Sequence, residues 1–380
     1  MSFEPGVLLL TPCFSPNTGG IETHLDDLVK YLHSKKRPVT VITYRPLADD
    51  IKDYKKLEKL GEVTIQRRWW PRNKAVAKYT TNPYLNCLYS AGGLLFYAFA
   101  FLSRRQQRFS VIHAHGLYTA VAGRILGILF KKRLIVSLHA IYIFDPKRLI
   151  SKLVAWALNG SDLVHCLSDA CARELMKIGV SPRVLRTTYY WVDTERFFPR
   201  YISEYTETKP QEGLFVGRLV ENKGINVLKE LALRFPEFTF RVIGTGPLEK
   251  EVEAFARQHR NFVFEGKVAN DGLHKYYHQA DFLLIPSQYK EGLGRVIIEA
   301  MYCGVPVIGS KIGGIAEAVD SEVGILTDGS VEGFSSALRE IRSNPTKLRA
   351  LSAKCTSYSH AKFGLKNAEA IYASYSGAPS

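Results

Sequence analysis

Short, continuously apolar runs alternate with amphipathic stretches along the chain, and this alternation limits the possible folds more than any other feature. Continuous hydrophobicity is typical of parallel strands that are buried on both faces. The stretch 22–34 repeats leucine at helical spacing between two such runs. The chain is therefore predicted to form two doubly wound α/β domains in series. The runs interpreted as buried strands are Val7–Leu10, Val39–Thr43, Val63–Ile65, Val111–Ala114, Leu134–Leu138, Leu163–Cys166, Leu214–Val216, Phe238–Ile243, Val263–Phe264, Phe282–Ile285 and Val305–Gly309.

A polar, proline-containing stretch, Val192–Glu212, divides the two series of runs and is the best linker candidate. We expect a first domain over residues 1–192 and a second over 193–359. A last helix, at about 360–380, is expected to pack back on the first domain. Ligands of open α/β sheets bind beyond the carboxyl ends of the strands, so the chemistry is expected in a cleft between the two domains.

Composition places the chain among globular proteins, with 46% apolar and 23% charged residues in 380. The first residues carry an acid and a proline where a secretory signal needs a basic segment, so we expect a cytoplasmic location. The six cysteines form no CxxC pair and no zinc spacing. They are interpreted as reduced thiols without a catalytic role.

The excess positive charge lies entirely in the first half of the chain. Residues 1–190 contain 28 Lys and Arg against 13 Asp and Glu, which accounts for the whole net charge of +15. This asymmetry predicts an anionic partner for the first domain: an acidic membrane, a phosphorylated acceptor or nucleic acid. Because no nucleic-acid-binding signature accompanies the charge, we expect no nucleic acid.

The segment Leu94–Leu102 is uninterrupted apolar sequence, followed by Arg104 and Arg105. It is shorter than the ~20 residues that span a bilayer. A helix buried against the first sheet is favoured, and an interfacial membrane helix is the alternative.

The strongest chemical signal lies in residues 286–317. A strand is predicted to end at Ile285, and the following loop contains Glu291. Glycines at 292 and 294 then open a helix that carries Glu299. Glycines at a helix start expose N–H groups to an anion such as a diphosphate. The two carboxylates could serve two parts of one extended ligand; taken alone, they could also be ordinary solvated side chains.

These residues resemble a known family. Glu291 through Val307 is similar to the E-G-F-G-x-x-x-x-E-A-M-x-x-G-x-P-V motif of family 4 of the retaining GT-B glycosyltransferases, with Leu293 in place of phenylalanine. The amino-terminal glycine loop resembles that of enzymes that glycosylate phosphatidylinositol, such as mannosyl- and N-acetylglucosaminyltransferases. Further segments match family motifs in the same order: Gly19–Glu22, Val111–His115, Ser137–His139, Phe215–Leu219, Glu221–Gly224, Gly244–Pro247 and Ala280–Asp281.

The resemblance implies a GT-B fold, with two Rossmann-like domains facing across a cleft. The first domain would bind the acceptor and the second a nucleotide-sugar such as a UDP-sugar or GDP-mannose. Arg218 and Lys223 would neutralise the donor diphosphate, which suits a guanidinium fork and an ammonium. Glu291 would contact the transferred sugar and Glu299 the ribose. The other residues implied in donor binding are Gly20, Gly217, Gly246, Pro247, Val268, Gly292, Leu293 and Gly294.

His139 would lie over the reacting sugar, or else be a core histidine at a strand end. His113 and His115 are interpreted as structural. The family's P-N-G-V-D before the hinge is replaced here by the segment Tyr189–Asp193, so no acceptor is inferred from it. No D-x-D stands where a metal-dependent transferase needs one, so no metal and no cofactor are expected.

Three alternatives stay open: a GT-B phosphorylase or epimerase, a soluble transferase that makes a small glycoside, and a non-catalytic protein that binds membrane surfaces. A cluster of basic residues and tryptophans would suit the last of these alternatives, and it would also suit an enzyme with a lipid-linked acceptor. Such residues suit a headgroup interface, although both rings could instead turn into the core. The cluster consists of Arg67, Arg68, Trp69, Trp70 and Arg72.

Overall fold

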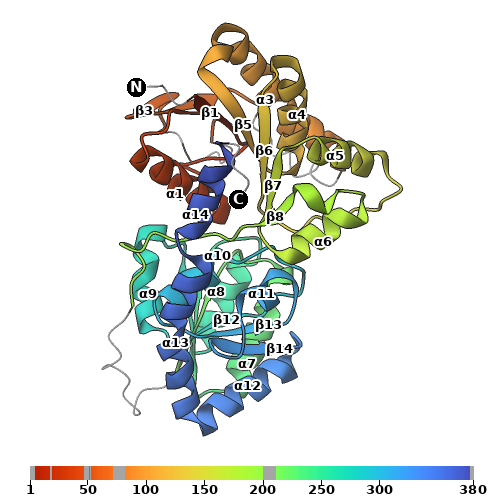
Figure 1. The fold of residues 1–380 in the computed structure, drawn as a ribbon. Helices are drawn as coiled ribbons and strands as arrows, with labels where there is room; N and C mark the ends of the chain where they lie inside the picture. Colours follow the sequence, from red (N-terminus) through yellow and green to blue (C-terminus); the bar gives the residue numbers. More distant parts are fainter. Residues whose placement is uncertain are drawn as a thin grey trace. The chain divides into compact units, whose positions relative to one another are not determined.

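The computed structural model describes residues 5–17, 19–46, 51, 53–71, 82–199 and 211–376. The chain forms two compact α/β units (Figure 1). Unit 1 comprises Met1–Tyr189 together with Leu365–Ser380, and unit 2 comprises Tyr190–Gly364.

Unit 1 is built on an eight-stranded sheet in the order β3-β4-β2-β1-β5-β6-β7-β8. Every neighbouring pair is parallel except β3 with β4. The strands are β1 (Gly6–Leu10), β2 (Val39–Tyr44), β3 (Leu57–Leu60), β4 (Val63–Arg68), β5 (Phe109–His115), β6 (Arg133–Leu138), β7 (Leu163–Cys166) and β8 (Leu185–Thr187). The helices are α1 (Gly20–Ser34), α3 (Pro83–Arg105), α4 (Leu117–Phe130), α5 (Leu149–Asn159), α6 (Asp169–Lys177) and α14 (Lys366–Ser374).

Helices cover both faces of this sheet, as right-handed crossovers require (Figure 1). On one face α3, α4 and α5 pack side by side. Leu8 and Leu10 of β1 point into the core beneath them and share it with Leu94 and Leu102 of α3. On the other face α1 packs against α14, where the Tyr31 and Tyr372 rings meet edge to face at 6.3 Å.

Helix α3 is longer than the apolar run at its centre. The Asn82 side chain caps it by accepting the backbone N–H groups of Tyr84 and Leu85, a strong N-terminal signal. The helix has 23 residues, so the length expected from Leu94–Leu102 alone was wrong. With the turn that follows, Pro83–Arg108 is long and apolar enough to cross a membrane by length and composition, at a mean hydropathy of 1.5. Its inner side is nevertheless buried in the core of unit 1.

Unit 2 is built on a six-stranded, fully parallel sheet in the order β11-β10-β9-β12-β13-β14. Its strands are β9 (Glu212–Val216), β10 (Thr239–Ile243), β11 (Phe262–Gly266), β12 (Phe282–Ile285), β13 (Val307–Ser310) and β14 (Gly324–Thr327). Its helices are α7 (Ile225–Arg234), α8 (Glu249–Gln258), α9 (Leu273–Gln279), α10 (Arg295–Tyr302), α11 (Gly313–Ala318), α12 (Val331–Ser343) and α13 (Pro345–Phe363).

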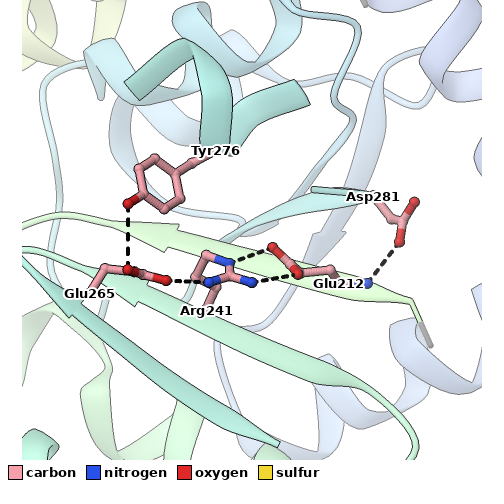
Figure 2. Close-up of polar contacts among 5 residues, drawn as sticks. All are labelled: Glu212, Arg241, Glu265, Tyr276 and Asp281. Carbon is pink, nitrogen blue, oxygen red and sulfur yellow. Dashed lines mark hydrogen bonds and ion pairs between the residues drawn. The ribbon is translucent and has the colours of Figure 1, made fainter. Parts of the chain in front are cut away.

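A polar network ties three strands of unit 2 together (Figure 2). Arg241 of β10 donates to both carboxylate oxygens of Glu212 on β9, at 2.7 and 3.0 Å, and also pairs with Glu265 of β11. Hydrogen bonding to Glu212 raises the pKa of Arg241. Tyr276 of α9 reaches Glu265 at 3.4 Å. These bonds join side chains within the sheet, and we interpret the network as structural.

The doubly wound α/β class predicted from the sequence is confirmed, with every expected buried strand present. Among the described residues, three short strands were not predicted: β3, β8 and β14. Strand β3 has four largely exposed residues, β8 has three residues and β14 has four. Each lies at a sheet edge, where fewer apolar residues are needed. Within the expected linker, residues 200–210 lie outside the described residues.

Candidate functional site

The strand order of unit 2 reverses between β9 and β12. From β9 the chain winds outward through β10 and β11, and from β12 it winds the other way through β13 and β14. In doubly wound sheets, ligands bind where the loops leave the carboxyl ends of the two strands at such a reversal, here β9 and β12. The segments predicted to hold the donor, 217–223 and 291–294, are these two loops.

An ion pair joins the two loops. The Nζ of Lys223, in the turn before α7, lies 2.7 Å from a carboxylate oxygen of Glu291. The Ser287 hydroxyl donates to the same carboxylate oxygen, and the Lys223 ammonium lies 5.4 Å from the centre of the Tyr289 ring. The Lys223 side chain is 22% exposed and Glu291 is nearly buried. The pair therefore holds a partly accessible cation at the reversal of strand order between β9 and β12, here called the switch point.

Glycines let the neighbouring loops approach this edge closely. At Gly244, where φ is +146°, an added Cβ would lie 1.8 Å from the Gly217 carbonyl oxygen. At Gly246 it would lie 2.4 Å from the Leu219 carbonyl oxygen. Backbone bonds lock the same loops, because Leu219 N–H donates to Thr245 at 2.9 Å. Any side chain at Gly244 or Gly246 would push the β9 and β10 loops apart.

The other donor-binding candidates of unit 2 occupy the same edge. Arg218 follows β9 directly and is exposed, and among the described residues its guanidinium has no carboxylate partner. Pro247 follows β10 and is exposed, and Val268 follows β11 and is half-buried. Leu293 is buried, so in place of the family's phenylalanine it serves as a core residue of this loop. Gly292 and Gly294 flank it directly before α10.

Glu299 lies deeper than its expected role in ribose binding suggested. It is 2% exposed on α10, and one oxygen accepts Arg295 Nε at 2.9 Å. Its other oxygen accepts the Tyr277 hydroxyl at 3.0 Å. Arg295 in turn donates to the Trp191 carbonyl at 3.2 Å. Sequence reasoning missed both Arg295 and Tyr277, although Arg295 stands four residues before Glu299, the spacing of a helical ion pair.

Histidines line the carboxyl edge of unit 1. His115 and His113 end β5, and His139 follows β6. His115 Nδ1 lies 3.0 Å from His139 Nε2, and their rings stack at 5.3 Å. His113 bonds to the Tyr375 hydroxyl at 2.7 Å and to Ser137 at 2.8 Å. Gly20, exposed at the start of α1, lies at the same carboxyl edge.

These histidines are held neutral. Burial lowers the pKa of His139 to about 4 and that of His165, on β7, to about 3. The pKa values of His113 and His115 are lowered well below their usual range, first by burial and then by neighbouring histidines. The sequence predicts a structural role for His115, and the structure adds that its ring contacts His139. The H-x-H spacing on one strand, which puts both rings on one face, was the available signal.

The basic cluster with tryptophans does not form one exposed face. Arg67 is buried and donates to Glu58 at 2.9 Å and to the Ser15 carbonyl at 2.8 Å. Trp70 stacks on Tyr44 at 5.2 Å and packs on the core. The expectation of a headgroup interface is thus corrected for these two residues.

The rest of the cluster is only partly at the surface. Trp69 is 60% exposed, with the Arg45 guanidinium 5.4 Å from its ring centre. Arg68 is half-buried, and its guanidinium lies 5.7 Å from the centre of the Tyr97 ring. Arg72 lies outside the described residues. Within the described ranges no group of three or more His, Cys, Asp and Glu side chains is placed to hold a metal.

Comparison with known families identifies the class of this fold and site. The model "Glycosyltransferase Family 4" matches residues 18–196, and "Glycosyl transferases group 1" matches residues 202–362. The crystal structure of HepE from Anabaena with UDP superimposes with a TM-score of 0.75 at 19% identity, over 98% of this chain and all of that one. The fold is that of the GT-B glycosyltransferases. The chain belongs to glycosyltransferase family 4.

Curated relatives agree with this family. An uncharacterized glycosyltransferase of Methanocaldococcus jannaschii is 27% identical over 351 residues, which cover 90% of this chain and 86% of that protein. A human phosphatidylinositol N-acetylglucosaminyltransferase is 23% identical over 365 residues, which cover 89% of this chain and 69% of that protein.

Proposed function

We propose that the protein is a retaining glycosyltransferase that moves a hexose-type sugar from a nucleoside diphosphate sugar to the hydroxyl of a lipid-linked or phosphorylated acceptor, without a metal. The observation that carries the proposal is the Lys223–Glu291 pair at the switch point of unit 2. It sets a cation for the diphosphate beside a carboxylate that can accept sugar hydroxyls.

Several features of the same edge suit a nucleoside diphosphate sugar. Arg218 is exposed at the end of β9 and can add a bidentate contact to the diphosphate. Gly244 and Gly246 let the loop after β10 pack closely on the loop that carries Arg218. A structural neighbour, HepE from Anabaena, was crystallised with UDP-glucose. A uridine nucleotide is therefore the first donor to test.

In the proposed retaining transfer, the acceptor attacks the sugar from the face that the leaving group vacates. The bond between the sugar C1 and the leaving phosphate oxygen breaks, and the acceptor oxygen bonds to C1 on the same face. The acceptor proton passes to the leaving phosphate oxygen. The protein then contributes positioning and charge stabilisation, and Lys223 and Arg218 stabilise the diphosphate as it departs. The contact of His139 with the sugar stays a prediction.

The proposed acceptor rests on the charge of unit 1 and on the relatives. The excess of Lys and Arg in residues 1–190 suits an acceptor that carries phosphate. The human and yeast relatives are named as phosphatidylinositol N-acetylglucosaminyltransferases. Phosphorylated lipids are therefore the acceptors to test first.

The test is a screen of UDP-, GDP- and ADP-sugars for thermal stabilisation and hydrolysis, followed by transfer to phosphatidylinositol and to soluble sugar phosphates. One donor should stabilise the protein and yield a product with the donor's anomeric configuration, read by proton NMR. Inverted configuration would overturn the retaining mechanism. If no donor stabilised the protein or was hydrolysed, the proposed reaction would be wrong.

A separate assay with excess EDTA addresses the metal. Because Lys223 and Arg218 supply the charge that a divalent cation would otherwise provide, turnover is expected to stay within about twofold of its value without EDTA. Loss of turnover that magnesium or manganese restores would contradict the metal-free part of the proposal.

A further inference from the structure

Helix α3 has an apolar side that faces away from the core. Leu85, Leu88, Phe96 and Phe99 recur at helical spacing on this outer side, and Leu88 and Phe96 are 69% and 66% exposed. The inner side of the helix is buried at Leu94. A helix that is hydrophobic all round is normally covered on every side, and among the described residues nothing covers the outer side of α3 at Leu88 and Phe96.

The outward sides of α4 and α5 continue this apolar surface. Ile128 and Leu129 at the end of α4 are more than half exposed, and the Phe130 ring lies 5.5 Å from that of Phe99. On α5, Leu149 and Trp156 are exposed at helical spacing. Because α4 packs against both α3 and α5, the three outward sides form one layer, here called the α3–α5 face.

Cations interrupt this face, and the stretch of chain that forms it is poor in acids. Residues 82–160, which contain the three helices, hold ten Lys and Arg against one acid, Asp145. Lys131 directly follows Phe130, and Lys152 lies in the outer row of α5. The Arg124 guanidinium lies 5.9 Å from the centre of the Trp156 ring.

We infer that the α3–α5 face docks on the surface of an anionic lipid bilayer, with its apolar side chains among the acyl chains and its cations at the headgroups. Such a combination of aromatic and aliphatic residues with Lys and Arg is typical of interfacial helices. The inference deepens the proposed function, since it would bring the enzyme to a lipid acceptor, and it replaces the basic cluster around Arg67 as the docking element.

Charge and packing favour a bilayer surface over two other arrangements. A second copy of this chain would place two strongly positive faces against each other, and like charges across an interface are repulsive. A membrane-spanning α3 would have to withdraw Leu94, Ala98 and Leu102 from the core that they share with β1. A helix that lies flat keeps these contacts and offers only its outer side.

Flotation of the full-length protein with vesicles tests the docking face. Binding to vesicles of phosphatidylcholine with phosphatidylglycerol is expected to exceed binding to phosphatidylcholine alone and to fall with salt. Each cation near such a surface contributes roughly fivefold, so the double change Lys131→Ser with Lys132→Ser should weaken binding about 25-fold. Leu88→Gln with Phe96→Gln should weaken it at least tenfold.

Two matched controls lie elsewhere on unit 1. Lys35 and Lys36 follow α1 as Lys131 and Lys132 follow α4, and in each pair one lysine has a left-handed backbone conformation. Leu57 and Leu60 are exposed on edge strand β3. Changing the lysine pair to serine, or the leucine pair to glutamine, should leave vesicle binding unchanged. Thermal unfolding of every variant verifies the fold.

Three outcomes would overturn the docking face: no binding to anionic vesicles, equal loss in the control variants, or wild-type binding by both α3–α5 variants. Light scattering tests whether a second copy of this chain covers the face instead. If the protein were a dimer, and the Leu88 and Phe96 changes dissociated it while vesicle binding stayed intact, the face would be a dimer interface. Hydrolysis of the nucleotide-sugar is measured in parallel. Intact hydrolysis without vesicle binding rejects the docking face alone, whereas vesicle binding without hydrolysis rejects the proposed reaction alone.

Discussion

Lys223 and Glu291 are far apart in the chain, and the fold joins them. Each was expected in the site from its own motif, but their ion pair was not, because it depends on β9 and β12 being neighbours. The pair has two consequences for the proposed reaction. It fixes the direction of the lysine before any ligand binds, and it shields a nearly buried carboxylate that would otherwise carry an unpaired charge.

We expect Lys223→Ala and Arg218→Ala each to lower kcat/KM by about 10²–10³, because each removes a charge opposed to the departing diphosphate, an effect of roughly 3–4 kcal/mol. Steady-state kinetics with the identified donor measures it. Lys229→Ala is the matched control, since Lys229 also pairs with a glutamate, Glu251, but lies on α7 away from the switch point. Wild-type kinetics in both site variants would contradict the assignment.

Glu291 and Glu299 should respond differently to substitution by glutamine. Glu291→Gln is expected to reduce transfer more than it weakens the bare nucleoside diphosphate, since Glu291 is assigned to the sugar. Glu299→Gln should weaken the nucleotide. It should also lower the free energy of unfolding by about 3 kcal/mol, because it removes the charge that pairs with the buried Arg295 guanidinium.

Nucleotide titration by calorimetry and urea unfolding separate the two effects. Tyr277→Phe is the control, as it removes one hydrogen bond to Glu299 and keeps the charge pair. If Glu291→Gln weakened the nucleotide and Glu299→Gln did not, the two roles would have to be exchanged.

At the scale of elements, the central buried strands could be predicted from the sequence, and the strands at the sheet edges could not. Continuous apolar runs such as Val39–Thr43 identify central parallel strands because these are buried on both faces. Strand β3 has exposed residues and pairs antiparallel to β4, so its sequence carries no such run. The length of α3 was also missed, because its amino-terminal half contains the polar Asn86 and Ser90 before the apolar run begins.

The candidate site was predictable only where a motif was short and local. Gly217 and Gly246 could be placed at strand ends from the sequence. The contacts of Glu299 with Tyr277, and of His139 with His115, join different elements and needed the fold. For Arg67 and Trp70 the predicted headgroup interface was wrong. A run of basic and aromatic residues has the same sequence pattern whether its side chains face lipid or form contacts inside the protein.

The histidines that end β5, β6 and β7 should make unit 1 sensitive to acid. Their folded-state pKa values lie below the ordinary value of about 6.5, so folding favours the neutral rings. Their contribution to stability is complete above about pH 6.5 and is lost as the pH falls towards about 4. For His139 alone the loss at pH 5 is about 2 kcal/mol.

Urea unfolding at pH 8 and pH 5, compared between the wild type and His139→Gln, measures this dependence. The variant should lose less stability on acidification, although it is less stable at pH 8. His274, which is half-buried in unit 2, supplies the control, because its change to glutamine leaves the histidines of unit 1 untouched. Equal stability of the wild type at both pH values would refute the expectation.

At the scale of the whole molecule, the last helix belongs to the first unit. Helix α14 packs on α1, Tyr375 bonds to His113 within the core, and Arg133 donates to the Ser374 and Tyr375 carbonyls. Unit 2 is therefore an insertion between Tyr189 and Leu365, and the chain crosses between the units twice.

Removing α14 by ending the chain at Gly364 should destabilise unit 1. The lost contacts leave His113 without its tyrosine and uncover the apolar side of α1. Tyr375→Phe, which removes only the buried hydrogen bond, should cost about 1–3 kcal/mol. Limited proteolysis should cut the shortened chain first within unit 1. Preferential cleavage of unit 2 instead would show that α14 does not support unit 1.

The return of α14 also sets an order of events during synthesis. All strands and helices of unit 2 precede Leu365, so they are synthesised before the segment that completes unit 1. Unit 1 is translated first but is finished last, because its sheet waits for residues 365–376 to cover α1 and to reach His113. The unit that carries the exposed α3–α5 face is thus the unit whose chain is completed last.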